Sequence, residues 1–166
     1  MRRTVLQAVT AFALAALVSP VLRGRPDIPR FDTILYGASY YWEYMPTERL
    51  EKDFELMEKA GISFIRVGES SWGVLEPSDG RFDLDWLGRV LDRAHKAGIK
   101  VILGTPTYSI PAWLFKEHPE IQVKQAGQPR YSYGLRQMTD LTHPVYRRYA
   151  DRIIRKLVGR FRDHPA

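Results

Sequence analysis

Apolar positions along the chain alternate between two patterns, and their order predicts alternating strands and helices. Short apolar runs at residues 33–37, 63–67 and 100–103 are typical of buried strands that are covered on both faces of a parallel sheet. Between these runs, apolar residues recur at helical spacing: Leu50, Phe54 and Met57, then Leu87, Val90, Leu91 and Ala94. A last helix is predicted from Pro144, because proline suits the first helical position. Its apolar side is Val145, Tyr149, Ile153, Leu157 and Phe161.

An internal repeat supports this order. Residues 59–67 read Lys-Ala-Gly-Ile followed by an apolar strand, and residues 96–104 repeat the pattern 37 positions later. Glycine after the last helical turn takes the left-handed conformation without steric cost, so each copy predicts the end of a helix and the start of a strand. At the helix starts, Thr47 and either Asp83 or Asp85 are the expected N-caps.

The spacing predicts an α/β fold of the (β/α)₈ TIM-barrel type, with three βα units and a following helix present. An open doubly wound sheet fits less well, and no glycine-rich phosphate loop follows a strand. A complete barrel needs about 250 residues. We therefore expect residues 31–166 to be the N-terminal part of a larger catalytic domain.

Residues 1–30 are predicted to be a leader. Arg2 and Arg3 precede an apolar run from Ala8 to Val18, and Ser19-Pro20 ends it. This is the layout of a signal peptide, and the run is too short for an ordinary membrane-spanning helix. Four of the six net positive charges fall in these 30 residues. The body therefore has no basic patch that would indicate a nucleic-acid partner, and we expect an exported protein.

Polar and aromatic residues follow the predicted strands, where TIM barrels hold their active sites. The candidates are Tyr40, Tyr41, Glu43, Arg66, Glu69, Trp72, Thr105 and Tyr108. Arg66 occupies the place that Leu103 holds in the repeat, and a guanidinium at a buried strand end needs a partner, for which Glu69 is near. Two interpretations stay open: a substrate-binding arginine, or a structural Arg–Glu pair that closes the barrel top.

Aromatic residues are concentrated in the same loops, and they favour a carbohydrate site. Stacking on sugar rings is one interpretation, and packing of loops onto the barrel is the alternative, for Tyr40, Tyr41, Trp42, Tyr44, Trp72 and Trp113. Glu76 is interpreted as a carboxylate that organises its loop. The chain has no cysteine and its histidines lack metal-ligand spacing, so no metal site is predicted.

Several motifs in this order resemble glycoside hydrolase family 42, the β-galactosidases. They are Tyr40-Tyr41-x-Glu43, Ile65-Arg66-Val67-Gly68-Glu69-x-x-Trp72, Leu75-Glu76-Pro77, Gly80-Arg81-Phe82-Asp83, Gly104-Thr105-Pro106-Thr107, Pro111-Ala112-Trp113-Leu114, His118-Pro119-Glu120-Ile121, His143-Pro144-Val145-Tyr146-Arg147 and His164-Pro165-Ala166. Trp42 replaces the proline that the family often has. The stretch 136–140 is similar to the branch that lacks the zinc-binding cysteines.

The resemblance implies a retaining hydrolase of terminal β-D-galactosides that uses two glutamates and no cofactor. Both glutamates are expected beyond Ala166, so this chain is expected to hold no catalytic residue and to be inactive alone. The resemblance implies that Arg66 contacts the galactose, with Glu69 and Trp72 as further substrate-binding candidates. It also implies a homotrimeric parent protein.

Two alternatives remain open. A related TIM-barrel glycosidase could act on another β-linked sugar, such as an arabinoside or a fucoside. A non-catalytic sugar-binding or interaction module is the alternative of another class. That module would need a partner, because part of a barrel exposes strand edges and apolar surface.

Overall fold

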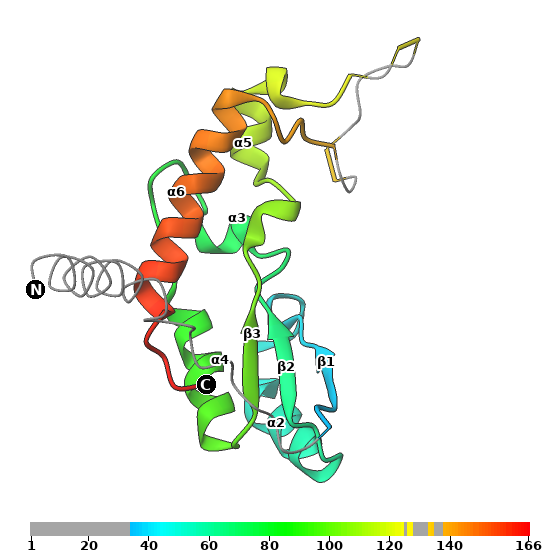
Figure 1. Ribbon diagram of the computed structural model, residues 1–166, viewed down its shortest axis with the longest axis vertical. Helices are drawn as coiled ribbons and strands as arrows, with labels where there is room; N and C mark the ends of the chain where they lie inside the picture. The colour runs from blue at the N-terminus through cyan, green and yellow to red at the C-terminus, as the bar shows by residue number, and fades with distance from the viewer. Residues whose placement is uncertain (1–33, 125, 128–132, 135–137) are drawn as a thin grey trace, which may run out of the picture. The chain divides into compact units, whose positions relative to one another are not determined.

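Three parallel strands form one sheet, in the order β1-β2-β3, in a computed structural model of the chain (Figure 1). The structure describes residues 34–124, 126–127, 133–134 and 138–166. β1 (Gly37–Ser39) pairs with β2 (Phe64–Val67), and β2 pairs with β3 (Lys100–Leu103). The predicted second and third strands and the βα order are thereby confirmed.

The first strand begins later than predicted, at Gly37 rather than at residue 33, which lies outside the described residues. Pairing with β2 sets its position, because Gly37 lies opposite Phe64 and Ser39 lies opposite Arg66. Residues 34–36 are as apolar as a strand but are not part of the ladder. A strand this short is therefore defined by its partner more than by its own hydrophobicity.

The main helices follow the predicted periodicity. They are α2 (Leu50–Lys59), α4 (Asp85–Lys96) and α6 (Pro144–Phe161), with the short helices α3 (Trp72–Leu75) and α5 (Ala112–Glu117) in the loops after β2 and β3. Single 3₁₀ turns occupy Trp42–Tyr44, Thr47–Arg49, Pro106–Tyr108 and Pro119–Ile121. The start of the last helix at Pro144 is confirmed, and the ring Nδ1 of His143 accepts a hydrogen bond from the amide of Val145 at 3.3 Å.

The ends of the first two helices agree with the repeat, but their starts do not agree with the predicted caps. Gly61 and Gly98 have φ of +71° and +68°, as expected for the residue after a helix. Thr47 instead opens a 3₁₀ turn, and its hydroxyl contacts Glu48. Asp85 is already the first residue of α4, and its amide donates to the carboxylate of Asp83 at 3.4 Å.

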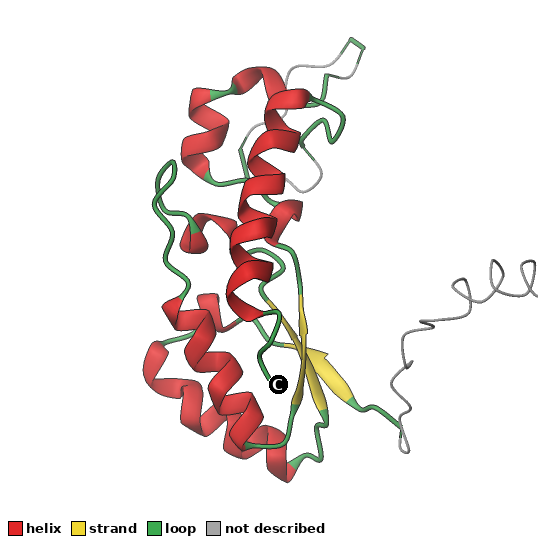
Figure 2. Cartoon of the chain, turned by 60° about the vertical axis from the view of Figure 1, so that its left-hand side comes forward, coloured by secondary structure: helices red, strands yellow, loops and turns green. Residues whose placement is uncertain are grey.

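The helices lie on one side of the three strands, as Figure 2 shows. Ile65 and Val67 point to this side and are buried in the core, which also contains Phe54 of α2 and Leu87 of α4. The opposite side carries Ile102, which is 50% exposed. The prediction of strands covered on both faces therefore holds for one face. An apolar residue on each face is typical of a sheet that closes into a barrel.

Helix α6 is tied to the loop after β2 and to α4. Arg152 of α6 forms ion pairs with Glu76 and Asp79, the latter at 2.6 Å. Phe161, the last residue of α6, packs close to Gly88 of α4. These contacts bring the last helix, far along the sequence, beside the ends of the strands.

None of the helices in the described ranges has the length and apolar character needed to cross a bilayer. The leader predicted for residues 1–30 lies outside the described residues, and export stays a prediction.

Candidate active site

Arg66 and Glu69 meet at the carboxyl end of β2. Gly68, with φ of +85°, turns the chain there, and a Cβ on it would lie 3.3 Å from the carbonyl oxygen of Gly104. The turn brings the Glu69 carboxylate back to the Arg66 guanidinium, and the two form an ion pair. The predicted partnership of Arg66 and Glu69 is therefore confirmed. The ion pair by itself does not test whether Arg66 or Glu69 binds a substrate.

The loop after β1 contributes to the same cluster. The Tyr41 hydroxyl donates a hydrogen bond to Oε2 of Glu69 at 3.1 Å, and this is also the oxygen that pairs with Arg66. Glu69 is thus oriented by two neighbours that share one of its carboxylate oxygens.

A hollow of about 400 Å³ opens beside this cluster. It is lined by Arg66, Glu69, Gly104, Thr105, Thr107, Tyr108, Leu141 and Tyr146. The side chains of Arg66 and Glu69 are 42% and 28% exposed, so both reach the hollow. The lining offers a cation, one carboxylate, hydroxyl groups and aromatic surface, which together suit a polar ring such as a sugar.

Trp72 takes a different position from the one expected of a sugar-binding residue. Its side chain is fully buried, and its indole nitrogen donates to Oε2 of Glu76 at 2.9 Å. The ring packs on Tyr146, with centroids 6.4 Å apart. Because its side chain is not exposed, Trp72 does not line the hollow in this structure. It packs against Tyr146, which does line the hollow.

The packing alternative is confirmed for most of the other loop aromatics. The Tyr40 ring packs edge-on against Phe54, and its hydroxyl donates to Asp53 at 3.1 Å. Burial, reinforced by Asp53, raises the pKa of Tyr40 well above its usual range. Trp42 is buried and stacks on Trp86, and the Trp113 indole donates to the carbonyl of Glu76 at 2.7 Å. Tyr41 and Tyr44 keep exposed surface near the hollow.

The candidates taken from the strand ends omit four residues of the hollow: Gly104, Thr107, Leu141 and Tyr146. Leu141 also lies outside the family motifs, while the other three belong to them. Tyr146 is buried on α6, and its hydroxyl donates to the carbonyl of Thr107 at 2.9 Å, which fixes the loop after β3. A tyrosine among the apolar residues of a helix looks like an ordinary core residue. Only the packing of α6 against the strand ends brings it to the site.

Glu43 carries a carboxylate that the fold buries without pairing it. Neither oxygen has a hydrogen-bonding partner among the described residues beyond a contact with its own backbone amide. Burial therefore raises the pKa of Glu43 above the ordinary value of 4.5. The folded protein binds this proton more tightly than the unfolded chain does, so the resulting stability is present at low pH and lost as the pH rises through the raised pKa.

Replacing Glu43 by glutamine is expected to raise stability at neutral pH by about 1–2 kcal/mol, because an unpaired buried charge is removed. At pH 4 the difference should be smaller, because this pH lies below the ordinary value of 4.5 and most Glu43 carboxyl groups are then protonated in both the folded and the unfolded state. Thermal unfolding at pH 4 and pH 7 measures the difference. Glu48→Gln, which changes an exposed carboxylate five residues away, is the matched control. A lower melting temperature of Glu43→Gln at pH 7 would contradict this account.

Within the described ranges, no three histidine, aspartate or glutamate side chains lie close enough to hold a metal ion. Asp140 has a local role in its turn: its Oδ1 accepts from the hydroxyl and the amide of Thr142 at 2.6 and 2.8 Å. These hydrogen bonds lower the pKa of Asp140.

Comparison with known proteins identifies the family. The family model of glycoside hydrolase family 42, described as β-galactosidase, matches residues 39–166. A β-galactosidase of Arthrobacter sp is 42% identical over 131 residues, which are 79% of this chain and 19% of that protein. The β-galactosidase BgaH of Haloferax lucentense is 40% identical over 130 residues, with shares of 78% and 20%.

Solved structures of β-galactosidases are also similar to this chain. The cold-adapted β-galactosidase of Rahnella sp. R3 superposes with a TM-score of 0.79 at 33% identity, covering 82% of this chain and 20% of that one. The β-galactosidase of Marinomonas ef1 gives a TM-score of 0.74 at 37% identity, with shares of 78% and 20%. The three βα units match part of the TIM barrel of this family. The chain spans about a fifth of the length of these relatives, and it belongs to glycoside hydrolase family 42, the β-galactosidase family.

Proposed function

We propose that this chain provides the galactose-binding part of a retaining β-galactosidase. The observation that carries the proposal is the Arg66–Glu69–Tyr41 cluster, which faces a hollow at the carboxyl ends of parallel strands in a chain of this family. The relatives that it matches are named β-galactosidases, and a terminal β-D-galactoside is therefore the proposed substrate.

The chemistry of the cluster suits recognition of adjacent sugar hydroxyls. Arg66 supplies charged N–H donors in a planar fork, and Glu69 supplies a charged acceptor. A hydroxyl group both donates and accepts, so two neighbouring hydroxyls of galactose can engage both residues together. Because Tyr41 and Arg66 already orient Glu69, little ordering remains to be done when the sugar binds.

Bond cleavage requires two carboxyl groups about 5–5.5 Å apart in a retaining enzyme. The lining of the hollow includes one carboxylate, Glu69, which is paired with Arg66. We assign Glu69 to binding, and we place the acid/base and nucleophilic glutamates in parts of the barrel that this chain does not supply. One of them would protonate the glycosidic oxygen, while the other attacks the anomeric carbon.

A panel of nitrophenyl glycosides tests the proposal. The gene is expressed through to its stop codon, and hydrolysis is compared with that of the 166-residue chain. We expect β-galactoside to be the preferred substrate of the gene product and no turnover by the chain alone. Preference for a β-fucoside or an arabinoside would move the assignment to another sugar. Turnover by the 166 residues alone would contradict the placement of the catalytic glutamates.

A further inference from the structure

Unpaired polar atoms are concentrated in and against the turn Trp42–Tyr44, which directly follows β1. Among the described residues, five buried side-chain nitrogen and oxygen atoms have no hydrogen-bonding partner. Four of them are the two carboxylate oxygens of Glu43 and the indole nitrogens of Trp42 and Trp86, whose rings stack 4.6 Å apart. Because a buried charge without a partner is costly, this concentration indicates that the turn has a polar partner outside the described residues.

The arginines of the neighbouring segments already have other partners. Arg49 and Arg66 each form an ion pair with another carboxylate. Arg89 of α4 lies over the Trp42 ring, with its guanidinium carbon 5.9 Å from the ring centroid. None of these three arginines bonds the Glu43 oxygens, so the carboxylate is left for a donor from another segment of the protein.

β1, the strand that leads into this turn, is an open edge of the sheet (Figure 1). Its neighbour among the described strands is β2, and Ala38 and Ser39 are exposed, although parallel strands are normally covered. In a closed barrel each strand has a neighbour on both sides. The barrel of this family therefore places a further parallel strand against β1, and the carboxyl end of that strand lies on the same side of the barrel as Glu43.

The two unpaired oxygens on one carboxylate favour a donor with two parallel N–H groups. A guanidinium has this planar fork, bonds both oxygens of a carboxylate together, and stays charged when it is buried. A lysine offers a point charge, and a hydroxyl group offers a single donor. The chemistry of Glu43 therefore selects arginine as its partner.

We propose that Glu43 binds an arginine side chain from the strand that closes the barrel against β1. The ion pair joins the two strands at their carboxyl ends, where the barrel closes. The inference goes beyond the proposed function, because it depends on the barrel and not on which sugar is bound.

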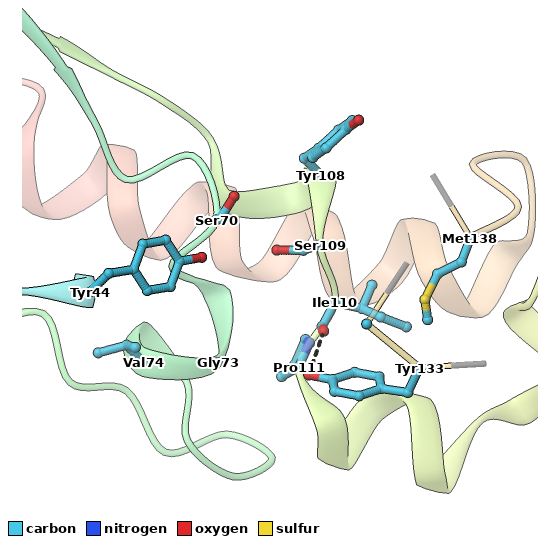
Figure 3. A pocket seen from close by; sticks show the side chains of 11 residues that line it. Tyr44, Ser70, Gly73, Val74, Tyr108, Ser109, Ile110, Pro111, Tyr133 and Met138 are labelled. Atoms are coloured by element: carbon cyan, nitrogen blue, oxygen red, sulfur yellow. Dashed lines mark hydrogen bonds between the residues drawn. The ribbon is translucent and has the colours of Figure 1, made fainter. Parts of the chain in front are cut away.

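This ion pair also fixes the turn from which Tyr41 reaches Glu69. Tyr41 and Tyr44 flank Glu43 closely along the chain, and their rings stack with centroids 5.9 Å apart. Tyr44 points toward the loop after β2, which carries Ser70 (Figure 3), and the Tyr41 hydroxyl donates to Glu69 at 3.1 Å. Glu43 is therefore a positioning residue that acts on the candidate site through Tyr41.

Thermal unfolding of the gene product at pH 7 tests the ion pair. Glu43→Gln leaves the arginine without its counter-charge, so we expect the melting temperature to fall by about 5 °C. The sign is opposite to that expected for the same substitution in the 166-residue chain, where the carboxylate is unpaired. Glu48→Gln changes an exposed carboxylate of the next turn and should leave the melting temperature within about 1 °C.

A crystal structure of the gene product identifies the partner directly. We expect a guanidinium from the strand beside β1 to lie within about 3.2 Å of both Glu43 oxygens. A lysine or a water molecule in that place, or a donor from any other element, would overturn the proposal. An unchanged or higher melting temperature of Glu43→Gln in the gene product would overturn it as well, because the carboxylate would then have no partner to lose.

A double-mutant cycle tests the positioning role, with kcat/KM measured on whichever nitrophenyl glycoside the gene product prefers. Tyr41→Phe and Glu43→Gln should each lower kcat/KM by about threefold to tenfold, the usual cost of one hydrogen bond. Because Glu43 acts through Tyr41, the double variant should lose no more than Tyr41→Phe alone. Losses that multiply would show that Glu43 affects only the fold, and the positioning role would be wrong. The choice of glycoside tests the proposed function separately.

Discussion

Replacing Glu76 by alanine is expected to lower the free energy of unfolding by about 3–5 kcal/mol, because it breaks a buried charged network. The Glu76 side chain is fully buried. It accepts hydrogen bonds from the Trp72 indole at 2.9 Å and from the amide of Gly80 at 3.0 Å, and it forms an ion pair with Arg152 of α6. Without it, the Trp72 indole loses its acceptor in a region that water does not reach, because Trp72 is fully buried.

The position of Glu76 in this network explains the large loss in the free energy of unfolding that we expect when Glu76 is replaced. Glu76 joins the loop after β2 to α6, and its own carbonyl accepts the Trp113 indole from α5. The interpretation of Glu76 as a loop-organising carboxylate is therefore confirmed, and the structure extends its reach to two further helices. Because Trp72 packs on Tyr146, loss of the network also loosens one wall of the candidate site.

Chemical denaturation of the wild type and variants measures this effect. Asp79→Ala is the matched control: Asp79 pairs with the same Arg152, but its side chain is 45% exposed, so we expect a loss below about 1 kcal/mol. Glu76→Gln keeps an acceptor for the indole and should fall between the two. A cost for Glu76→Ala no larger than that for Asp79→Ala would contradict the assigned role.

Replacing Arg66 by alanine is expected to reduce kcat/KM for a β-galactoside by about 10²–10³, the usual cost of removing one well-placed donor in an active site. Arg66 lies in the hollow and orients Glu69, so the variant loses a contact to the sugar and the alignment of a second. Arg66→Lys keeps the charge but loses the planar fork, and it should recover only part of the activity.

The Arg66 measurement must separate binding from folding. The Arg66 side chain is 42% exposed, so its removal should leave the melting temperature nearly unchanged. Arg155→Ala is the control, because Arg155 also belongs to an ion pair, with Asp151, but lies far more exposed on α6. Arg66→Ala with activity within about threefold of the wild type would exclude Arg66 from substrate binding.

The candidate site was predictable in part. The spacing of Arg66 and Glu69 around Gly68 lies within one short stretch, so their partnership could be inferred from local sequence. The burial of Trp72 could not, because it depends on Glu76 and on Tyr146, which is 74 residues further along the chain. The same motif thus contains two residues that line the hollow, Arg66 and Glu69, and one that supports it, Trp72.

Local chemistry also fails where helices begin. Threonine is a residue type that favours the N-cap position, but Thr47 is the first residue of a 3₁₀ turn that precedes α2, and it does not cap that helix. The first strand shows the same limit, because residues 34–36 look like a strand while the ladder with β2 begins at Gly37. In both places the neighbouring segment, and not the local propensity, sets the boundary.

The sequence by itself determined the order of strands and helices, because the period of apolar residues reports which face of each element is buried. It also determined the turns at Gly61 and Gly98, since glycine adopts a positive φ without steric cost. Only the tertiary structure decided which polar and aromatic residues face a ligand. That outcome depends on contacts between segments far apart in the chain, such as α6 with the loop after β2, and no local pattern encodes them.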